Sequence, residues 1–379
     1  MSEAVVIIGS GLAGYNVARE LRKADANVPI VVVSRDHAGF YSKPMLSNAL
    51  AGKKTAATLV MKNAEKMAED IKGRVIGHAE VTGIDTAART LTLAGGEVLP
   101  YRDLVLALGA DPIRLPLKGD AADTVLSVND LDDFAKFAEA LDTAAGGQPV
   151  KRVAILGAGL IGCEFANDLL HRGIEPTVLD LADRVLSRLL PPEASQLLQD
   201  KLQAGGTSFR FGVGASSIDK AGNGLKVTLS DGNTLDTDLV LSAIGLKPRT
   251  QLAAAAGADI GRGVKVNREL ATNVPHIYSV GDCAEVEGHL LPYVMPLMQQ
   301  ARALAATLAG KPTPVAYPAM PVVVKTPAWP TVVCPPPANA AGQWVVTSTE
   351  EAVEARFVAT DNAEQLLGFA LQGKAVTQR

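Results

Sequence analysis

Two glycine-rich stretches carry the clearest chemical signal, VVIIGSGLAG (5–14) and VAILGAGLIG (153–162). In a Gly-x-Gly-x-x-Gly series, the first glycine allows a tight turn, the second lets the backbone approach a pyrophosphate, and the third lets a helix pack on a strand. The helix N-terminus that follows offers N–H groups to the phosphates. Each series therefore predicts a dinucleotide site, with binding residues Gly9, Gly11, Leu12, Ala13 and Gly14 in the first and Gly157, Gly159, Ile161 and Gly162 in the second.

The two stretches differ at the end of the next strand, where an acidic residue usually holds the ribose hydroxyls of the nucleotide. In the second, PTVLD places Asp180 18 residues after Gly162. A carboxylate accepts a hydrogen bond from a 2′ hydroxyl and repels a 2′-phosphate, so Asp180 favours NADH over NADPH. In the first, IVVVSRD places Ser34 and Arg35 at this point, a pair that taken alone predicts a 2′-phosphate pocket.

A third stretch, TNVPHIYSVGDCAEV (272–286), changes that interpretation. It places Gly281 and Asp282 at the end of an apolar strand, where the carboxylate can accept from a ribityl hydroxyl of FAD. A turn aspartate that caps the following helix is the alternative. Together with the first glycine series, this stretch assigns the first site to one non-covalent FAD. Arg35 then packs on, or pairs with, the adenosine half of FAD, and the second site takes NADH.

Composition limits the remaining functions. The 379 residues are 47% hydrophobic and carry a net charge of −4, which argues against a general nucleic-acid binder. The opening MSEAVVIIGSG lacks the basic region and cleavage site of a signal peptide, and no apolar run is long enough to cross a membrane, so we expect a cytoplasmic protein. The three cysteines form no close pair and the five histidines no metal-like cluster, so redox chemistry must come from an organic cofactor.

The elements that must position these residues occur twice in the same order: strand, glycine loop, helix, strand, hairpin, buried strand and glycine. The first round is predicted as strands at 4–8 and 30–33, a helix at 12–24, a hairpin within 75–93 and a strand at 104–110. The second round ends in a hairpin and strand at 225–241 and 239–245, after a helix at 130–140 that precedes its glycine loop. A helix at 294–308 and a proline-rich segment at 311–337 follow.

This order predicts an α/β protein with two Rossmann-like dinucleotide-binding domains and a small α+β carboxyl-terminal domain. The NAD-binding domain is inserted into a discontinuous FAD-binding domain. The predicted boundaries are 1–113 and 248–315 for the FAD-binding domain, 114–247 for the NAD-binding domain and 316–379 for the carboxyl-terminal domain.

The motifs resemble those of the flavoproteins with two dinucleotide-binding domains, over nearly the whole chain. The resemblance rests on both glycine series, on LVLALGA (104–110), on AIGLKP (243–248) and on Gly281-Asp282. The disulfide reductases of this group have a cysteine pair beside the flavin, and its NADH oxidases and peroxidases have one cysteine in the loop that here reads YSKPMLSNAL (41–50). This chain has neither, which leaves the branch that passes electrons to small iron–sulfur carriers.

Within that branch the chain looks most like the rubredoxin reductases. The resembling pieces include GAGLIGCEFANDL and, outside the shared motifs, MPVVVKTPAWPTVVCPPP. The nitric-oxide-linked flavorubredoxin reductases share several of these pieces. The resemblance implies that the backbone of Val81 contacts the FAD adenine and that Gly245 lines a cofactor site. A few residues are expected to be missing at the carboxyl end relative to that family.

The resemblance also implies roles for four further residues. Lys43 and Lys325 are expected to reach the flavin, and Val294 begins a helix whose N-terminus donates to the flavin edge. Glu164 is expected near the nicotinamide carboxamide, so that Lys43 and Glu164 are the predicted catalytic residues. The structural alternatives are surface positions for Lys43 and Glu164 and a protective edge-strand role for Lys325.

The resemblance therefore implies a rubredoxin–NAD(+) reductase, in which FAD takes electrons from NADH and passes them to rubredoxin. Such a chain of electron carriers would support a hydroxylase, for example in alkane oxidation and hydrocarbon degradation. The alternatives are reduction of a [2Fe–2S] ferredoxin or a flavorubredoxin, an NADH oxidase, and a non-enzymatic flavin-bound NADH sensor. We expect a monomer or weak dimer, no bound metal, and a basic rim near the flavin edge, because rubredoxins are usually acidic.

Overall fold

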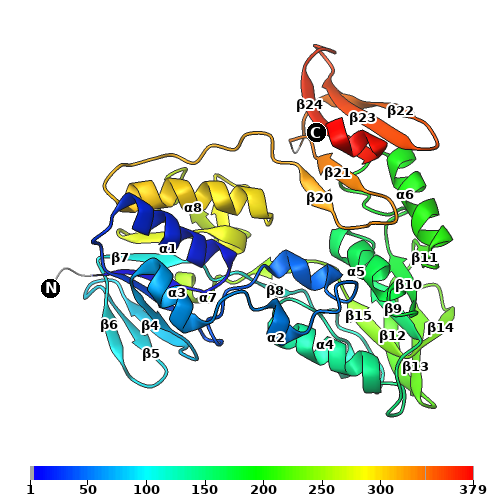
Figure 1. The fold of residues 1–379 in the computed structure, drawn as a ribbon, viewed down its shortest axis with the longest axis horizontal. Coiled ribbons are helices and arrows are strands. Elements are labelled where there is room, and N and C mark those ends of the chain that lie inside the picture. The colour runs from blue at the N-terminus through cyan, green and yellow to red at the C-terminus, as the bar shows by residue number, and fades with distance from the viewer. Residues whose placement is uncertain (1–3, 338, 379) are drawn as a thin grey trace. The chain divides into compact units, whose positions relative to one another are not determined.

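The computed structural model describes residues 4–337 and 339–378 (Figure 1). The chain divides into two compact units, each assembled from three separate stretches. Unit 1 comprises the residues up to Lys43, Val60–Asp111 and Leu246–Met320. Unit 2 comprises Pro44–Leu59, Pro112–Gly245 and the residues from Pro321 onward.

Unit 1 is built on a five-stranded parallel sheet, in the order β18 (Ile277–Ser279), β7 (Asp103–Leu106), β1 (Val5–Ile8), β2 (Ile30–Val33) and β3 (Arg74–Ile76). The central strand is entirely apolar because both of its faces are covered. Val5 and Ile7 pack with residues of α1 (Leu12–Ala24), α3 (Ala64–Ile71) and α8 (Val294–Leu308). Val6 and Ile8 pack with the antiparallel sheet of β4 (Val81–Asp85), β5 (Thr90–Leu93) and β6 (Val98–Pro100). Figure 1 shows α1 and α8 lying side by side.

Unit 2 repeats this plan. Its parallel sheet has the order β11 (Ser208–Phe211), β10 (Glu175–Asp180), β9 (Arg152–Leu156) and β15 (Leu239–Ser242). Ala154 and Leu156 pack with the antiparallel sheet of β12 (Ala215–Ala221), β13 (Gly224–Leu229) and β14 (Thr234–Thr237). Phe165 of α5 (Leu160–Leu170) packs edge-on against Phe137 of α4 (Leu131–Thr143), with ring centroids 5.5 Å apart. The duplicated order of elements predicted from the sequence is thus confirmed.

The carboxyl-terminal part of unit 2 is a five-stranded antiparallel sheet. Its order is β20 (Val322–Val324), β21 (Thr331–Cys334), β24 (Leu366–Gly373), β23 (Ala352–Ala359) and β22 (Gly342–Ser348), and the 3₁₀ turn η4 (Lys374–Gln378) follows. Gln372 of β24 donates a 3.0 Å hydrogen bond to the carbonyl oxygen of Ala194 in α6 (Pro192–Ala204). This sheet is therefore tied to the helices of the inserted Rossmann-like domain within the same unit.

The two helices predicted at 12–24 and 294–308 have these bounds in the structure. The strand predicted at 104–110 ends at Leu106, and Gly109 adopts φ +70° beyond it. The remaining short elements are η1 (Lys43–Asn48), α2 (Ala56–Leu59), β8 (Ala110–Pro112), η2 (Ala122–Thr124), β16 (Leu246–Pro248), α7 (Gln251–Ala255), β17 (Val264–Val266), η3 (Gly281–Cys283) and β19 (Ala284–Val286). Among the residues described, no helix combines the length and the apolar character that crossing a membrane requires.

Candidate dinucleotide sites

The first glycine series forms the turn between β1 and α1 in unit 1. Gly9 has φ +117°, and a Cβ there would lie 2.1 Å from the carbonyl oxygen of Ala107. A Cβ at Gly14 would lie 1.9 Å from the carbonyl oxygen of Gly9. Gly11 differs, because a Cβ there would meet no heavy atom of the described residues within 4 Å, its chain neighbours apart, and its φ of −70° suits any residue. The fold itself requires glycine at positions 9 and 14 but not at Gly11.

The second series forms the corresponding turn between β9 and α5 in unit 2. Gly157 has φ +107°, and a Cβ there would lie 2.6 Å from the carbonyl oxygen of Ala243. A Cβ at Gly162 would lie 1.9 Å from the carbonyl oxygen of Gly157. Gly159 has φ −77° and a Cβ there would again meet nothing within 4 Å. In this loop too, the fold requires glycine at positions 157 and 162 but not at Gly159. We call Gly11 and Gly159 the open glycines.

The open glycines mark where a ligand fits. Gly11 and Gly159 are the N-caps of α1 and α5, and neither helix end is closed by a side-chain hydrogen bond. In this type of turn the central glycine is the one that lets a pyrophosphate approach the backbone and the helix N-terminus. Because the surrounding protein does not require either glycine, both loops fit the phosphates of a dinucleotide.

The third motif lies against the first glycine loop within unit 1. Gly281 has φ +81°, and a Cβ there would lie 2.7 Å from the Cβ of Ala13. Its N–H donates to Gln300 Oε1 of α8 at 2.8 Å, which fixes the turn against that helix. Asp282 forms an ion pair with Lys43, with Oδ2 and Nζ 3.7 Å apart. The structure thus brings together three of the residues predicted to hold FAD: Ala13, Lys43 and Asp282.

The other residues predicted for the FAD site lie around the same loop. Ser34 follows β2 and is buried, and its carbonyl oxygen accepts from the N–H of Ala79 at 2.8 Å, just before Val81 begins β4. Arg35 is exposed, and Val294 at the start of α8 is 39% exposed. Ser34 and the segment leading to Val81 are therefore neighbours, while the roles of Arg35 and Val294 stay predictions.

In the second site, Asp180 lies at the carboxyl end of β10. Its Oδ2 accepts from the N–H of Ala158 in the glycine loop at 2.6 Å, and its Oδ1 accepts from the N–H of Ala182 at 2.7 Å. Ile161, in the first turn of α5, is 41% exposed. Gly245 follows β15 with φ +116°. The predicted ribose carboxylate thus lies beside the loop predicted to hold the phosphates.

Glu164 lies on α5 of unit 2, where its side chain is 0% exposed. Its Oε1 accepts from the main-chain N–H of Lys325 at 2.9 Å. Its Oε2 accepts from Lys325 Nζ and from the Ser47 hydroxyl. A carboxylate in the interior needs such partners, because an isolated buried charge costs several kcal/mol. The surface alternative for Glu164 is therefore wrong, and the structure pairs two residues that the resemblance assigned to separate tasks.

Ser47 and Asp168 are site residues that sequence reasoning missed. Asp168 lies one turn after Glu164 on α5, is 1% exposed, and accepts from the N–H groups of Leu50 and Ala51 at 2.9 and 2.8 Å. Burial raises the pKa of the Asp168 carboxyl, against the effect of these two hydrogen bonds. The sequence did contain a signal for Asp168. Glu164, Asn167 and Asp168 interrupt an otherwise apolar helix, so these side chains are expected to be buried and to need polar partners.

The cysteines are not arranged for thiol chemistry. Cys163 and Cys283 are buried and unpaired, and Cys334 is half-buried. Burial raises the pKa of the Cys163 thiol far above its ordinary value, so this group stays protonated. The three cysteines therefore form no redox-active pair.

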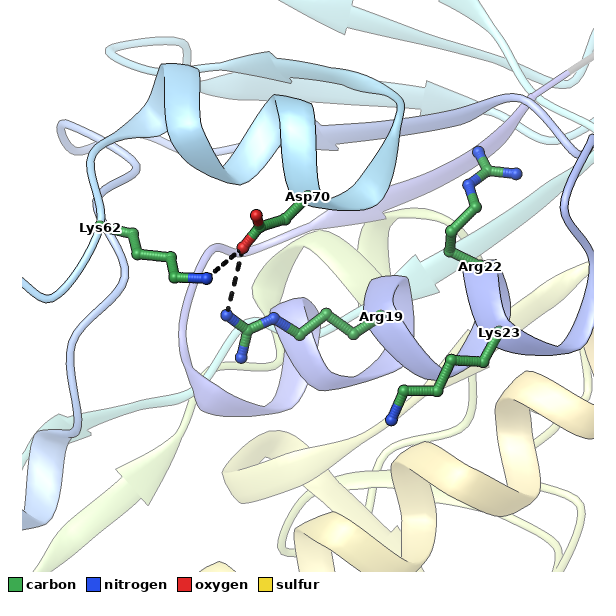
Figure 2. Close-up of a pocket in the computed structure, with 5 residues that line it drawn as sticks. All are labelled: Arg19, Arg22, Lys23, Lys62 and Asp70. Carbon is green, nitrogen blue, oxygen red and sulfur yellow. Dashed lines mark hydrogen bonds and ion pairs between the residues drawn. The ribbon is translucent and has the colours of Figure 1, made fainter.

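A basic hollow of about 320 Å³ also opens in unit 1, lined by Arg19, Arg22, Lys23, Lys62 and Asp70 (Figure 2). The dashed lines in Figure 2 show that Asp70 pairs with both Lys62 and Arg19, the latter at 3.8 Å. Arg22 donates to backbone carbonyl oxygens, including those that follow the ends of α1 and α3. Lys23 pairs with Glu20, so each of the four cations that line the hollow already has a partner in the fold.

Two family profiles match the chain. Residues 3–305 match the family described as pyridine nucleotide-disulphide oxidoreductase. Residues 314–379 match a domain described as rubredoxin binding C-terminal domain. Together these two profiles account for nearly the whole chain.

Named relatives and solved structures agree with these profiles. The rubredoxin-NAD(+) reductase of Alcanivorax borkumensis is 47% identical over 376 residues, which cover 99% of this chain and 96% of the relative. The nitric oxide reductase FlRd-NAD(+) reductase of Aeromonas hydrophila is 39% identical over 374 residues, which cover 98% of this chain and 94% of the relative. A solved ferredoxin reductase from Rhodopseudomonas palustris is 31% identical, with a TM-score of 0.89 over 100% of this chain and 93% of that one.

Proposed function

Because this chain belongs to the pyridine nucleotide-disulphide oxidoreductase family, we propose that it is an NADH-dependent flavoprotein that passes electrons from FAD to rubredoxin. The predicted fold class, the oxidoreductase activity with FAD and NADH, and the resemblance to rubredoxin reductases are confirmed by the family profiles and the relatives. The carboxyl-terminal profile supports rubredoxin as the acceptor.

One observation carries the proposal from the structure. A Cβ at Gly11 or at Gly159 would fit without touching neighbouring elements, so the fold itself does not require glycine at either position. Two such loops in one chain fit two dinucleotides, which is what a reductase needs if one nucleotide stays bound and the other brings electrons. FAD supplies the chemistry that joins them, because it can take two electrons from NADH together and release them one at a time.

We assign the residues of unit 1 to FAD. The loop from Gly9 to Gly14 and the start of α1 hold the pyrophosphate, and Asp282 accepts from a ribityl hydroxyl. Lys43 lies beside Asp282, so its ammonium group places a positive charge at that end of the site. A cation there favours the reduced cofactor, which carries more negative charge than the oxidised one.

We assign the residues of unit 2 to NADH. The loop from Gly157 to Gly162 holds the pyrophosphate, and Asp180 accepts from the adenosine ribose and repels a 2′-phosphate. Glu164 holds both the main chain and the ammonium group of Lys325, so these two residues act together and Glu164 sets where that ammonium group lies. The assignment of individual residues to the two cofactors rests on this geometry and on the resemblance.

We retain the three domains with boundaries at 1–113 and 248–315, 114–247, and 316–379, and a cytoplasmic location, where NADH is available as a reductant. Support of a hydroxylase, as in hydrocarbon degradation, is proposed on the strength of the Alcanivorax relative. Two other acceptors have specific support: a flavorubredoxin from the Aeromonas relative, and a ferredoxin from the solved Rhodopseudomonas reductase.

Anaerobic rapid mixing tests the proposal. The purified yellow protein is reduced with one equivalent of NADH and then mixed with oxidised rubredoxin, a rubredoxin-like domain of a flavorubredoxin, or a [2Fe–2S] ferredoxin. We expect NADH to bleach the flavin quickly and rubredoxin to restore its colour fastest. A flavin that stays reduced in the presence of rubredoxin would contradict the proposal. Slow bleaching with a long-lived charge-transfer band would instead favour the NADH sensor.

A further inference from the structure

The two glycine loops can be compared residue by residue, because each is flanked by strands in the same parallel register. The reference pairs are Ile8 with Val33 in the first copy and Leu156 with Leu179 in the second. Counted forward from these pairs, the corresponding positions are Ser10 and Ala158, Ser34 and Asp180, and Asp36 and Ala182. The carboxylate of the first copy is therefore displaced by two residues along the chain.

In the second copy, one carboxylate joins the strand end to the glycine loop directly. Asp180 accepts from the N–H of Ala158 with one oxygen and from the N–H of Ala182 with the other. The first copy has a serine at this position, so it lacks that direct contact. A carboxylate that joins the strand end to the glycine loop, as Asp180 does, has to come from another position in the first copy.

Asp36 restores the connection through two hydroxyl groups. Its Oδ1 accepts from Ser34 Oγ at 2.6 Å, from Ser10 Oγ at 3.1 Å and from the N–H of Ala38 at 2.9 Å. The two serine hydroxyls are also 2.8 Å apart, and both serines are 6% exposed. The carboxylate is thus held against the glycine loop by two buried hydroxyls instead of by a backbone N–H of that loop.

The second oxygen of Asp36 is available to a ligand. Among the described residues, Oδ2 accepts no hydrogen bond, since every bond to this side chain is to Oδ1. Burial raises the pKa of the Asp36 carboxyl, but the hydrogen bonds from Ser34, Ala38 and Ser10 and the neighbouring His37 together outweigh this effect and hold the pKa below its usual range. The side chain is therefore ionised at neutral pH and presents an oriented acceptor.

We propose that Asp36 accepts a hydrogen bond from the 2′ hydroxyl of the adenosine ribose of FAD, and that Ser10 and Ser34 position it for this task. From the sequence alone, Ser34 and Arg35 occupy the end of this strand, where the ribose carboxylate is usually found. A carboxylate at this point also explains why a Ser-Arg pair need not create a 2′-phosphate pocket, because it repels such a phosphate. The inference rests on the proposed function, in which FAD occupies the first glycine loop.

Flavin binding to the apoprotein tests this inference without any turnover. The protein is stripped of flavin and titrated with FAD and with its analogue that carries 2′-deoxyadenosine, followed by quenching of flavin fluorescence. We expect the wild type to prefer FAD roughly 10-fold, the size of one hydrogen bond to a charged acceptor. Asp36→Asn should bind both flavins with affinities within about 2-fold of one another, because the ionised acceptor is gone.

Asp180→Asn is the matched control, since it changes the corresponding carboxylate of the other copy and should keep the wild-type preference for FAD. Ser34→Ala removes only a positioning hydroxyl and should lower the preference by about 3-fold, so it tests the inference even if Asp36→Asn fails to fold. A wild type that binds both flavins equally, or an Asp36→Asn variant that keeps the full preference, would overturn the inference. A wild type that binds neither flavin would instead contradict the assignment of FAD to this chain.

Discussion

Glu164 shows how much a single residue in this fold depends on its partners. Its carboxylate is fully buried and receives three hydrogen bonds, two of them from Lys325 and one from Ser47. Removing one member of a buried ion pair leaves the other charge without compensation, which is usually more costly than removing both. The loss of stability on changing either Glu164 or Lys325 can therefore be predicted.

We predict that E164Q and K325M each lower the free energy of unfolding of unit 2 by about 2–3 kcal/mol. Both tryptophans of the chain, Trp329 and Trp344, belong to unit 2, so urea unfolding of the apoprotein can be followed by tryptophan fluorescence. The double variant E164Q/K325M should lose clearly less than the sum of the two single losses. Strictly additive losses would show that the two side chains do not depend on each other.

The sequence located Glu164 and Lys325 but not their pairing. The two residues are 161 positions apart, and only the packing of α5 against the segment after β20 brings them together. The same limit applies to Ser47 and Asp36, whose side chains act through partners from other elements. Residues that contact a cofactor through a local motif, such as Gly11 and Gly159, could be found because the motif itself carries the chemistry.

At the scale of elements, the segment Pro44–Leu59 is bonded within unit 2 to the carboxylates of α5, and its short helix α2 packs against α4. Asp168 of α5 accepts from two consecutive backbone N–H groups, of Leu50 and Ala51, and is buried in doing so. Lys53 and Lys54 follow and are exposed. Glu164 holds the start of the segment through Ser47, so loss of Asp168 should loosen the stretch around Leu50 and Ala51 while leaving the sheets intact.

We predict that D168A raises the rate of trypsin cleavage after Lys53 or Lys54 by roughly 10-fold, because local opening no longer breaks two hydrogen bonds to a charged acceptor. Mass spectrometry of timed digests identifies the cleaved bonds. D200A, at an exposed position on α6, is the control and should be cut at the wild-type rate. Equal cleavage of D168A and the control would show that the segment is held by other contacts.

Elements with a strong local pattern were predicted well. The helices at 12–24 and 294–308 have their predicted bounds, and both predicted hairpins are present as paired antiparallel strands. The loop at 41–50 contains the 3₁₀ helix η1, and the short helix α2 follows it. Its conformation depends on the bonds to Asp168 and Glu164, which no local pattern encodes.

At the scale of the whole molecule, the same plan is used twice with different residues at the decisive positions. Both copies place an open glycine at a helix N-cap, and both tie the end of the second strand to the glycine loop with a carboxylate. The copies differ in which residue supplies that carboxylate, and only the first is joined by a Gly-Asp motif. The Gly-Asp motif beside the first loop is the basis for proposing that this loop holds the flavin and that the second holds NADH.

The central claim is this division of labour between the two glycine loops, and the variants G11A and G159A test it most directly. Both should fold, because the added methyl group meets no described atom within 4 Å apart from those of its own chain neighbours, and both glycines have φ values open to alanine. The measurement is the FAD dissociation constant of each apoprotein together with the KM for NADH of each FAD-saturated protein, with ferricyanide as the acceptor. We predict that G11A weakens FAD binding by about 10-fold or more with little change in the KM for NADH, and that G159A does the reverse. If both variants lost the same ligand, or if the pattern were exchanged between them, the account would be contradicted.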